Sequence, residues 1–137
     1  MRDRLSKERR SWNMSRIRGK NTTPEIVVRS VLHRLGYRFR LHAKKLPGRP
    51  DVVLPKYRTA VFVHGCFWHR HRGCKNCTTP TNNRAFWVAK LGGNAARDRR
   101  NQSALVRLGW RVVTIWECET RGPATAVGAL IRRRCGL

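Results

Sequence analysis

Acidic residues are scarce in this chain of 137 residues, which has 7 Asp and Glu against 31 Lys and Arg and a formal net charge of +24. Such an excess of one sign repels itself within a compact fold, so an extended polyanion is the natural partner. Arginine outnumbers lysine, which suits bidentate contacts to phosphate and guanine. Composition therefore predicts nucleic-acid binding, although a basic structural protein, such as a ribosomal one, would share it.

Long apolar runs are also missing. None approaches the length of a membrane span, and residues 1–10 contain no apolar core of a signal peptide. We therefore expect a cytoplasmic, nucleoid-associated protein with no membrane partner. The chain has neither internal repeats nor low-complexity segments. Its length and its 40% of hydrophobic residues fit one compact domain with its own core.

The cysteines number five, an odd count that argues against a disulfide framework in a reducing compartment. Three Cys and His residues with short spacings, together with one distant cysteine, instead fit a closed tetrahedral zinc site that ties a loop to the sheet. The four candidate ligands are Cys66, His71, Cys74 and Cys118. Cys77 makes a second zinc-knuckle spacing with Cys74 and either replaces a ligand or is a spectator; free buried thiols are the other interpretation. Cys135 has no Cys or His nearby in the sequence at a metal-ligand spacing, so we assign it no role.

The pattern of apolar residues predicts one α/β domain over residues 22–137 with a mixed central sheet flanked by helices. Residues 1–21 are expected to form an arm that lies along DNA, with a frayed tail as the alternative. The predicted helices are 22–35, which begins with a Thr-Thr-Pro-Glu capping sequence, 83–108, which is expected to break near Gly92 and Gly93, and 123–134. The predicted strands are 37–41, 52–54, 60–63 and 110–116.

Asp51 ends a Pro-Gly-Arg-Pro-Asp turn at the edge of a strand, where a carboxylate can hold a divalent cation. The alternative is that it only caps the turn. His64 stands just beyond the end of the partner strand, and His69 follows in a loop that is rich in Cys, His and aromatic residues. A histidine at position 64 could hold a phosphate or protonate a leaving oxygen, and a neutral His69 could activate water.

One pair of aromatic residues lies inside this loop, and a second pair follows it in the sequence. Phe67 and Trp68 stand between the candidate zinc and catalytic residues, where they could wedge between bases. Phe86 and Trp87 begin the following helix. We expect Phe86 to belong to the core, as such residues do in most domains.

The chain resembles the very short patch repair (Vsr) mismatch endonucleases over residues 13–118. The matching segments are Asn13-Met14, Thr23-Pro24-Glu25, Leu46-Pro47-Gly48-Arg49-Pro50-Asp51, His64-Gly65-Cys66-Phe67-Trp68-His69, Phe86-Trp87, Asn94, Arg97-Asp98, Gly109-Trp110-Arg111-Val112 and Trp116-Glu117-Cys118. The resemblance implies a fold related to type II restriction endonucleases of the PD-(D/E)xK type, with a structural zinc added at the four ligands named above.

The resemblance also implies residue roles. Asp51 and the main-chain carbonyl of Val63 would bind a catalytic Mg²⁺, and Glu25 would contact a metal-bound water. In the family the residue at position 63 is often Thr, of which Val63 keeps the carbonyl. His69 would be the water-activating base, oriented by Asp98, while His64 would assist at the phosphate or leaving group.

For substrate recognition, the resemblance implies that Phe67, Trp68 and Trp87 intercalate beside the mismatch from the major groove. Met14 would wedge from the minor groove, and Asn94 belongs with the DNA-contacting residues. The implied substrate is duplex DNA with a T:G mismatch left by deamination of 5-methylcytosine, cut 5′ to the thymine. We expect a monomer, with other mismatch-repair proteins as further partners.

Two other functions remain open. One is a related single-domain nuclease with another DNA target, which would cut matched DNA or a different site. The other is a non-catalytic, zinc-stabilised DNA-binding module, which would tolerate the loss of Asp51. The combination of Asp51, His64 and His69 favours an enzyme.

Overall fold

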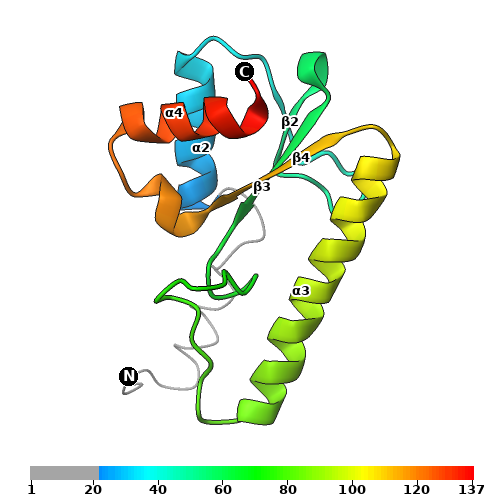
Figure 1. The fold of residues 1–137 in the computed structure, drawn as a ribbon, viewed down its shortest axis with the longest axis vertical. Coiled ribbons are helices and arrows are strands. Elements are labelled where there is room, and N and C mark those ends of the chain that lie inside the picture. The colour runs from blue at the N-terminus through cyan, green and yellow to red at the C-terminus, as the bar shows by residue number, and fades with distance from the viewer. Residues whose placement is uncertain (1–21) are drawn as a thin grey trace.

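The computed structural model describes residues 22–137, which form a single α/β domain (Figure 1). The strands are β1 (Arg40–Leu41), β2 (Val52–Leu54), β3 (Thr59–His64) and β4 (Arg111–Trp116). The helices are α2 (Thr23–Arg34), α3 (Arg84–Arg107) and α4 (Ala124–Cys135), with short 3₁₀ turns η1 (Pro55–Tyr57) and η2 (Glu117–Thr120). The predicted order of helices and strands is confirmed.

The four strands form one mixed sheet in the order β1-β2-β3-β4. β1 pairs with β2 and β2 with β3 in antiparallel fashion, whereas β3 and β4 are parallel. A parallel pair needs a long crossover, and α3 supplies it. The carboxyl ends of β3 and β4 therefore lie side by side at the same end of the sheet.

Helices cover both faces of the sheet (Figure 1). α2 and α4 pack on one face, where the larger core gathers Val28, Leu32, Val61, Ile115 and Ile131. α3 covers the other face through a smaller cluster of Ala60, Phe62 and Leu105. This three-layer arrangement buries both faces, which explains why β2 and most of β3 consist of buried residues.

The start of α2 agrees with the capping sequence. The Glu25 N–H donates to the Thr22 hydroxyl, and the Thr22 N–H donates to the Glu25 carboxylate, with Pro24 in the first turn. This reciprocal pair satisfies two N–H groups that would otherwise have no partner. Leu35 ends the helix, and Gly36 follows with a positive φ of 84°.

The predicted break near Gly92 and Gly93 is wrong, because α3 runs without interruption from Arg84 to Arg107. Two glycines weaken a helix by roughly 1 kcal/mol each relative to alanine. Contacts that α3 makes through Asn94 and Asp98, on the carboxyl side of the glycines, and through Trp87, on their amino side, outweigh that cost. Among residues 22–137, no helix is both long and apolar enough to cross a membrane.

The first predicted strand, 37–41, is shorter than expected. Only Arg40 and Leu41 pair with β2, while Tyr37 and Phe39 pack against the larger core. β2 itself has three residues, so it offers few partners for a longer neighbour.

Candidate active site

The candidate site lies at the carboxyl ends of β3 and β4. Successive side chains of a strand point to opposite faces of the sheet, so neighbouring residues of β3 contact different helices. Val61 and Val63 pack into the core beneath α2 and α4. Phe62 packs on the α3 side, and His64 touches its ring from the same side. In the parallel register His64 pairs with Trp116, which brings the two rings to a centroid distance of 5.4 Å.

Three chemically active side chains converge here from three elements: His64 ends β3, His69 follows in the loop and Asp98 belongs to α3. Their side-chain N and O atoms lie within 4.8 Å of one another. His69 Nδ1 is 2.6 Å from Asp98 Oδ2. A carboxylate only accepts, so Nδ1 carries the hydrogen and a neutral ring keeps Nε2 as a proton acceptor.

The rings of His64 and His69 stack with their centroids 3.8 Å apart and their planes 7° from parallel. Burial lowers the pKa of His64 to about 3, since its side chain is only 5% exposed and His69 lies against it. His64 is therefore neutral at neutral pH and can offer an N–H donor without a positive charge.

Asp51 follows a turn that packs tightly on α3. A Cβ at Gly48 would lie 2.9 Å from the Cβ of Asn101, and the positive φ of 76° at Gly48 also favours glycine. Beyond the turn, Asp51 Oδ2 accepts the Val63 N–H at 2.7 Å. The carboxylate thus bonds across to β3 instead of capping its own turn.

Burial raises the pKa of Asp51 to about 6, even though the hydrogen bond from Val63 works in the opposite direction. The nearby Glu25 carboxylate raises it further. Asp51 Oδ1 has no hydrogen-bond partner among residues 22–137. A partly buried carboxylate with one oxygen that no residue of 22–137 engages, beside a main-chain segment, fits a divalent cation, since Mg²⁺ takes one or two carboxylates and completes its shell with water and phosphate.

Glu25 is buried, with 1% of its surface exposed. Its Oε1 atom lies 2.7 Å from Nε2 of His42, a residue that the sequence analysis did not single out. A lone histidine after a two-residue edge strand gives little signal in the sequence. The contact appears only when β1 pairs with β2 and α2 packs above them.

A second cluster lies next to these histidines. The ligating atoms of Cys66, His71, Cys74 and Cys118 lie within 4.8 Å of one another, and Cys118 Sγ is 3.5 Å from His71 Nδ1. In a tetrahedral zinc site the ligand atoms are about 3.5 Å apart, given bond lengths of about 2.3 Å to sulfur and 2.0 Å to nitrogen. The four residues therefore fit the zinc site that the spacing predicted. Burial raises the pKa of the Cys66 thiol to about 12, so ionisation of that thiol depends on a bound cation.

Cys118 is held firmly at the end of β4. It lies within η2, where the Glu119 carboxylate accepts the Trp116 N–H at 2.9 Å and pairs with Arg134 of α4. Within the described residues, Cys77 is not among the four converging side chains. Cys135 is buried in the larger core, where it packs as an apolar residue.

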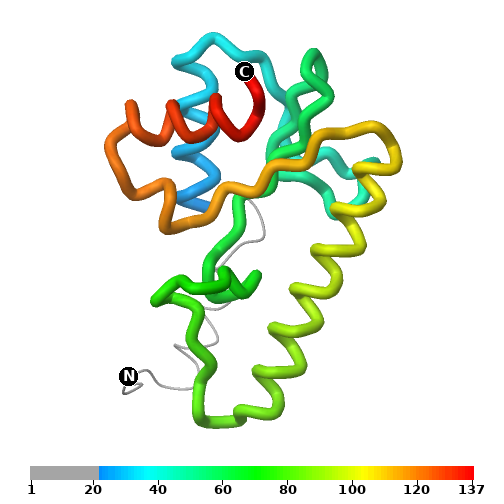
Figure 2. Tube along the Cα trace, viewed as in Figure 1, coloured from blue at the N-terminus to red at the C-terminus, as the bar shows by residue number. Residues whose placement is uncertain are grey.

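Phe67, Trp68 and Trp87 form one aromatic cluster, with ring centroids 5.0, 5.7 and 6.0 Å apart. All three are half-buried. Asn94 of α3 donates to the main-chain carbonyl of Trp68 at 3.1 Å, one residue before His69. The expectation that Phe86 belongs to the core is wrong: it is 58% exposed, because α3 extends away from the sheet at this end (Figure 2).

A cleft of about 490 Å³ opens beside the histidines, between α3 and β4. Arg70, Arg72 and Arg99 line it together with His69 and other residues. α3 also exposes further cations along its length, which are Arg84, Lys90, Arg97, Arg100 and Arg107. This surface suits a polyanion that approaches the histidines.

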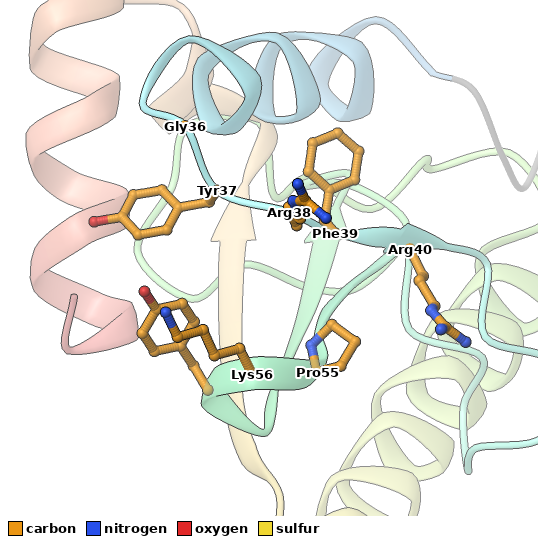
Figure 3. Close-up of a pocket in the computed structure, with 8 residues that line it drawn as sticks. Gly36, Tyr37, Arg38, Phe39, Arg40, Pro55 and Lys56 are labelled. Atoms are coloured by element: carbon orange, nitrogen blue, oxygen red, sulfur yellow. The ribbon is translucent and has the colours of Figure 1, made fainter.

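A cavity of about 520 Å³ lies elsewhere, between the segment 36–40 and η1 (Figure 3). None of the candidate site residues lines it. Met14 and the rest of the expected arm, residues 1–21, lie outside the described part of the chain.

Comparisons with known proteins find several that are similar to this chain. The family model described as DNA mismatch endonuclease Vsr matches residues 2–76. A type II nicking enzyme, V.XorIIP, of Xanthomonas oryzae pv. oryzae is 54% identical over 119 residues, which cover 87% of each chain. The DNA mismatch endonuclease Vsr of Escherichia coli K12 is 45% identical over 122 residues, 89% of this chain and 78% of the relative. The type II nicking enzyme V.NmeAIP of Neisseria meningitidis is 41% identical and covers 90% of this chain and 88% of its own.

Proposed function

The chain belongs to the Vsr family of DNA mismatch endonucleases, and from that premise we propose that it nicks one strand of duplex DNA 5′ to the thymine of a T:G mismatch, in a reaction that needs Mg²⁺. The biological setting would be very short patch repair, in which such mismatches arise from deamination of 5-methylcytosine. Family membership sets aside the non-catalytic DNA-binding module.

The observation that carries the proposal is the hydrogen bond of 2.6 Å between His69 and Asp98. This bond favours the tautomer of His69 that carries its hydrogen on Nδ1, where it faces Asp98. Nε2 is then unprotonated and can remove a proton from the attacking water. Asp98 would also stabilise the imidazolium that forms. His64, which stacks on His69 and is neutral, would donate a hydrogen bond to a phosphate oxygen or the leaving oxygen.

Asp51 and the Val63 carbonyl would hold the Mg²⁺, with Glu25 oriented toward its water ligands. When bound, the ion supplies charge neutralisation at the scissile phosphate. The hydrogen bond from the Val63 N–H to Asp51 supports this assignment, because it brings the Val63 main chain next to the carboxylate. Burial of Asp51 makes a compensating cation favourable.

A structural zinc would be held by Cys66, His71, Cys74 and Cys118. The ring of His71 stacks on Trp116 at 4.2 Å, and Trp116 also contacts His64. Loss of the metal would therefore disturb the catalytic histidines as well as the loop.

The aromatic cluster of Phe67, Trp68 and Trp87 would insert beside the mismatched pair and stack on the bases, with Met14 opposite it. Trp68 directly precedes His69 in the chain, so insertion at the mismatch would set the position of the scissile phosphate relative to the water that His69 activates. Asn94 would act by holding Trp68 through its main chain.

The deciding experiment is a nicking assay with T:G, U:G and fully paired duplexes, with and without Mg²⁺. The proposal expects a single nick 5′ to the mismatched T, only with Mg²⁺ present. The nicking enzymes among the relatives suggest a second candidate, a nickase with another target. Efficient cutting of a paired duplex in this assay would favour that second function.

A further inference from the structure

His42 has an unusual backbone conformation directly beside the candidate metal site. Its φ is +48°, in the left-handed region that few residues other than glycine adopt. At this point the regular ladder between β1 and β2 is interrupted: the N–H of His42 donates to the Asp51 carbonyl at 3.1 Å, and the next N–H, of Ala43, donates to the Pro50 carbonyl at 3.2 Å. Irregularities of this kind redirect a side chain.

The redirected side chain reaches Glu25. His42 Nε2 donates to Glu25 Oε1 at 2.7 Å, and Glu25 Oε2 accepts the Thr22 N–H at 3.2 Å. Both carboxylate oxygens are thus held, within a residue that is 1% exposed. Without His42, Oε1 would lose its only hydrogen bond among the described residues, and the carboxylate could rotate about its remaining contact.

His42 therefore links the two acidic residues. Its side chain bonds to the carboxylate of Glu25, and its main-chain N–H bonds to the main-chain carbonyl of Asp51. We propose that His42 is a positioning residue that fixes Glu25 relative to Asp51, so that the pair accepts the divalent cation. The identity of that cation site rests on the proposed function. Partners that orient the groups of a metal site commonly change affinity or activity by about 10- to 100-fold when removed.

A purely structural role for His42 has a different signature. If only the left-handed backbone mattered, asparagine, which adopts that conformation readily, would replace histidine well, and glutamine would do worse. If the hydrogen bond to Glu25 matters, the order reverses. A Gln Nε2 extends about as far from the backbone as the His Nε2, whereas an Asn Nδ2 ends short of Glu25.

The experiment compares His42→Gln and His42→Asn, with His33→Asn as the control, since His33 is exposed in the last turn of α2. We expect His42→Asn to raise the Mg²⁺ concentration for half-maximal nicking by about 10- to 100-fold. His42→Gln should stay within about threefold of wild type, and His33→Asn should match it. Equal values for all variants, or a worse result for Gln than for Asn, would overturn the proposal.

A second readout does not depend on activity. Mn²⁺ is titrated into each zinc-loaded protein without DNA, and the rise in Tm is recorded. Wild type and His42→Gln should reach half of the rise at similar Mn²⁺ concentrations, and His42→Asn at a concentration about tenfold higher. Identical midpoints for Gln and Asn contradict the role of His42. Failure of wild-type protein to nick T:G duplexes would instead contradict the proposed function and leave this comparison decisive for His42.

Discussion

Asn94 Nδ2 donates to the main-chain carbonyl of Trp68 at 3.1 Å, and one helical turn later Asp98 binds His69 at 2.6 Å. Two consecutive loop residues are thus fixed by two side chains at positions i and i+4 of α3, which lie on the same face of the helix. The spacing between the proposed wedge and the proposed base is consequently set by a rigid helix. Recognition of a mismatch and removal of a proton from water are linked by that spacing.

Asp98→Asn should reduce nicking by roughly 10³- to 10⁴-fold with little change in DNA affinity. An asparagine can turn its amide N–H toward His69 Nδ1, which then becomes the acceptor and moves the ring hydrogen to Nε2. The base would then be protonated at the position that must accept a proton. Single-turnover nicking and a binding titration at fixed salt measure the two quantities.

A matched control is Glu117→Gln, which removes the same charge from a half-exposed residue whose one ion pair within residues 22–137 is with Arg121 at 3.8 Å. It should nick at close to the wild-type rate, because an exposed pair contributes little. His69→Ala should be at least as impaired as Asp98→Asn while still binding duplex through the many Arg and Lys side chains. Normal rates for His69→Ala would exclude it as the base.

Asp51→Asn should raise the stability of the Mg²⁺-free protein at pH 7.5. The pKa of Asp51 is raised to about 6 by burial, from an ordinary value of 3.8. Since the folded state binds the proton more tightly than the unfolded one, the contribution of Asp51 to stability is fully present below pH 4 and is lost as the pH rises through 6. Above that pH the buried charge costs about 2–3 kcal/mol, at roughly 1.4 kcal/mol for each pKa unit.

The measurement is Tm in zinc-containing, Mg²⁺-free buffer at pH 5 and pH 7.5. At pH 7.5 Asp51→Asn should melt roughly 5–10 °C above wild type, and at pH 5 the gap should shrink. Added Mg²⁺ should stabilise wild type and leave the variant unchanged. A variant that melts below wild type at both pH values would mean that the carboxylate stabilises the fold without a metal.

Local sequence signals predicted much of this fold. The capping sequence at Thr22 located the start of α2, and the short runs rich in apolar residues at 60–63 and 110–116 located β3 and β4, because both signals depend on near neighbours. The continuity of α3 was missed because contacts to the distant loop residues Trp68 and His69 stabilise that helix. Phe86 was expected in the core because its type favours burial, but only tertiary packing decides which helix end the sheet covers.

The residues of the candidate site also differ in how far local sequence signals predicted them. The four ligands Cys66, His71, Cys74 and Cys118 followed from spacing and from the position of the last strand, whereas the roles of Asp98 and Glu25 came from resemblance to a family. His42 was missed because its importance depends on a left-handed backbone and on the packing of α2 over β1. Neither of these features has a signature in a single sequence.

Cys118→Ser should lose the zinc and loosen the loop, while Cys77→Ser should keep both. Cys118 comes from η2, which Glu119 and Arg134 fasten to α4, so it is the ligand that joins the loop to the sheet. Elemental analysis should find about one zinc per chain in wild type and Cys77→Ser. Trypsin should cut the loop at Arg70, Arg72 or Lys75 faster in Cys118→Ser. The opposite pattern of zinc retention would exchange the roles of the two cysteines.

The last prediction concerns the aromatic cluster and the energy of opening a base step. A T:G wobble pair stacks less stably than a Watson–Crick pair, so insertion of a side chain beside it costs less than in paired DNA. The flat faces of Phe67, Trp68 and Trp87 can replace lost base stacking at about 1–3 kcal/mol for each stacked base. Discrimination should therefore depend on these rings, whereas affinity for paired DNA should depend mainly on Arg and Lys.

Trp68→Ala should lower the ratio of affinities for T:G and paired duplexes by roughly 5- to 100-fold at fixed salt, because 1–3 kcal/mol of stacking is lost only at the mismatch. Phe86→Ala is the control, since Phe86 is an exposed aromatic residue next to Trp87 and lies outside the proposed wedge. Its ratio should remain that of wild type. Asn94→Ala should lie between the two, because Trp68 keeps its ring but loses its main-chain anchor. A ratio that is unchanged by Trp68→Ala, in a variant that stays folded and retains zinc, would assign Trp68 to packing within the loop and leave mismatch recognition to other side chains.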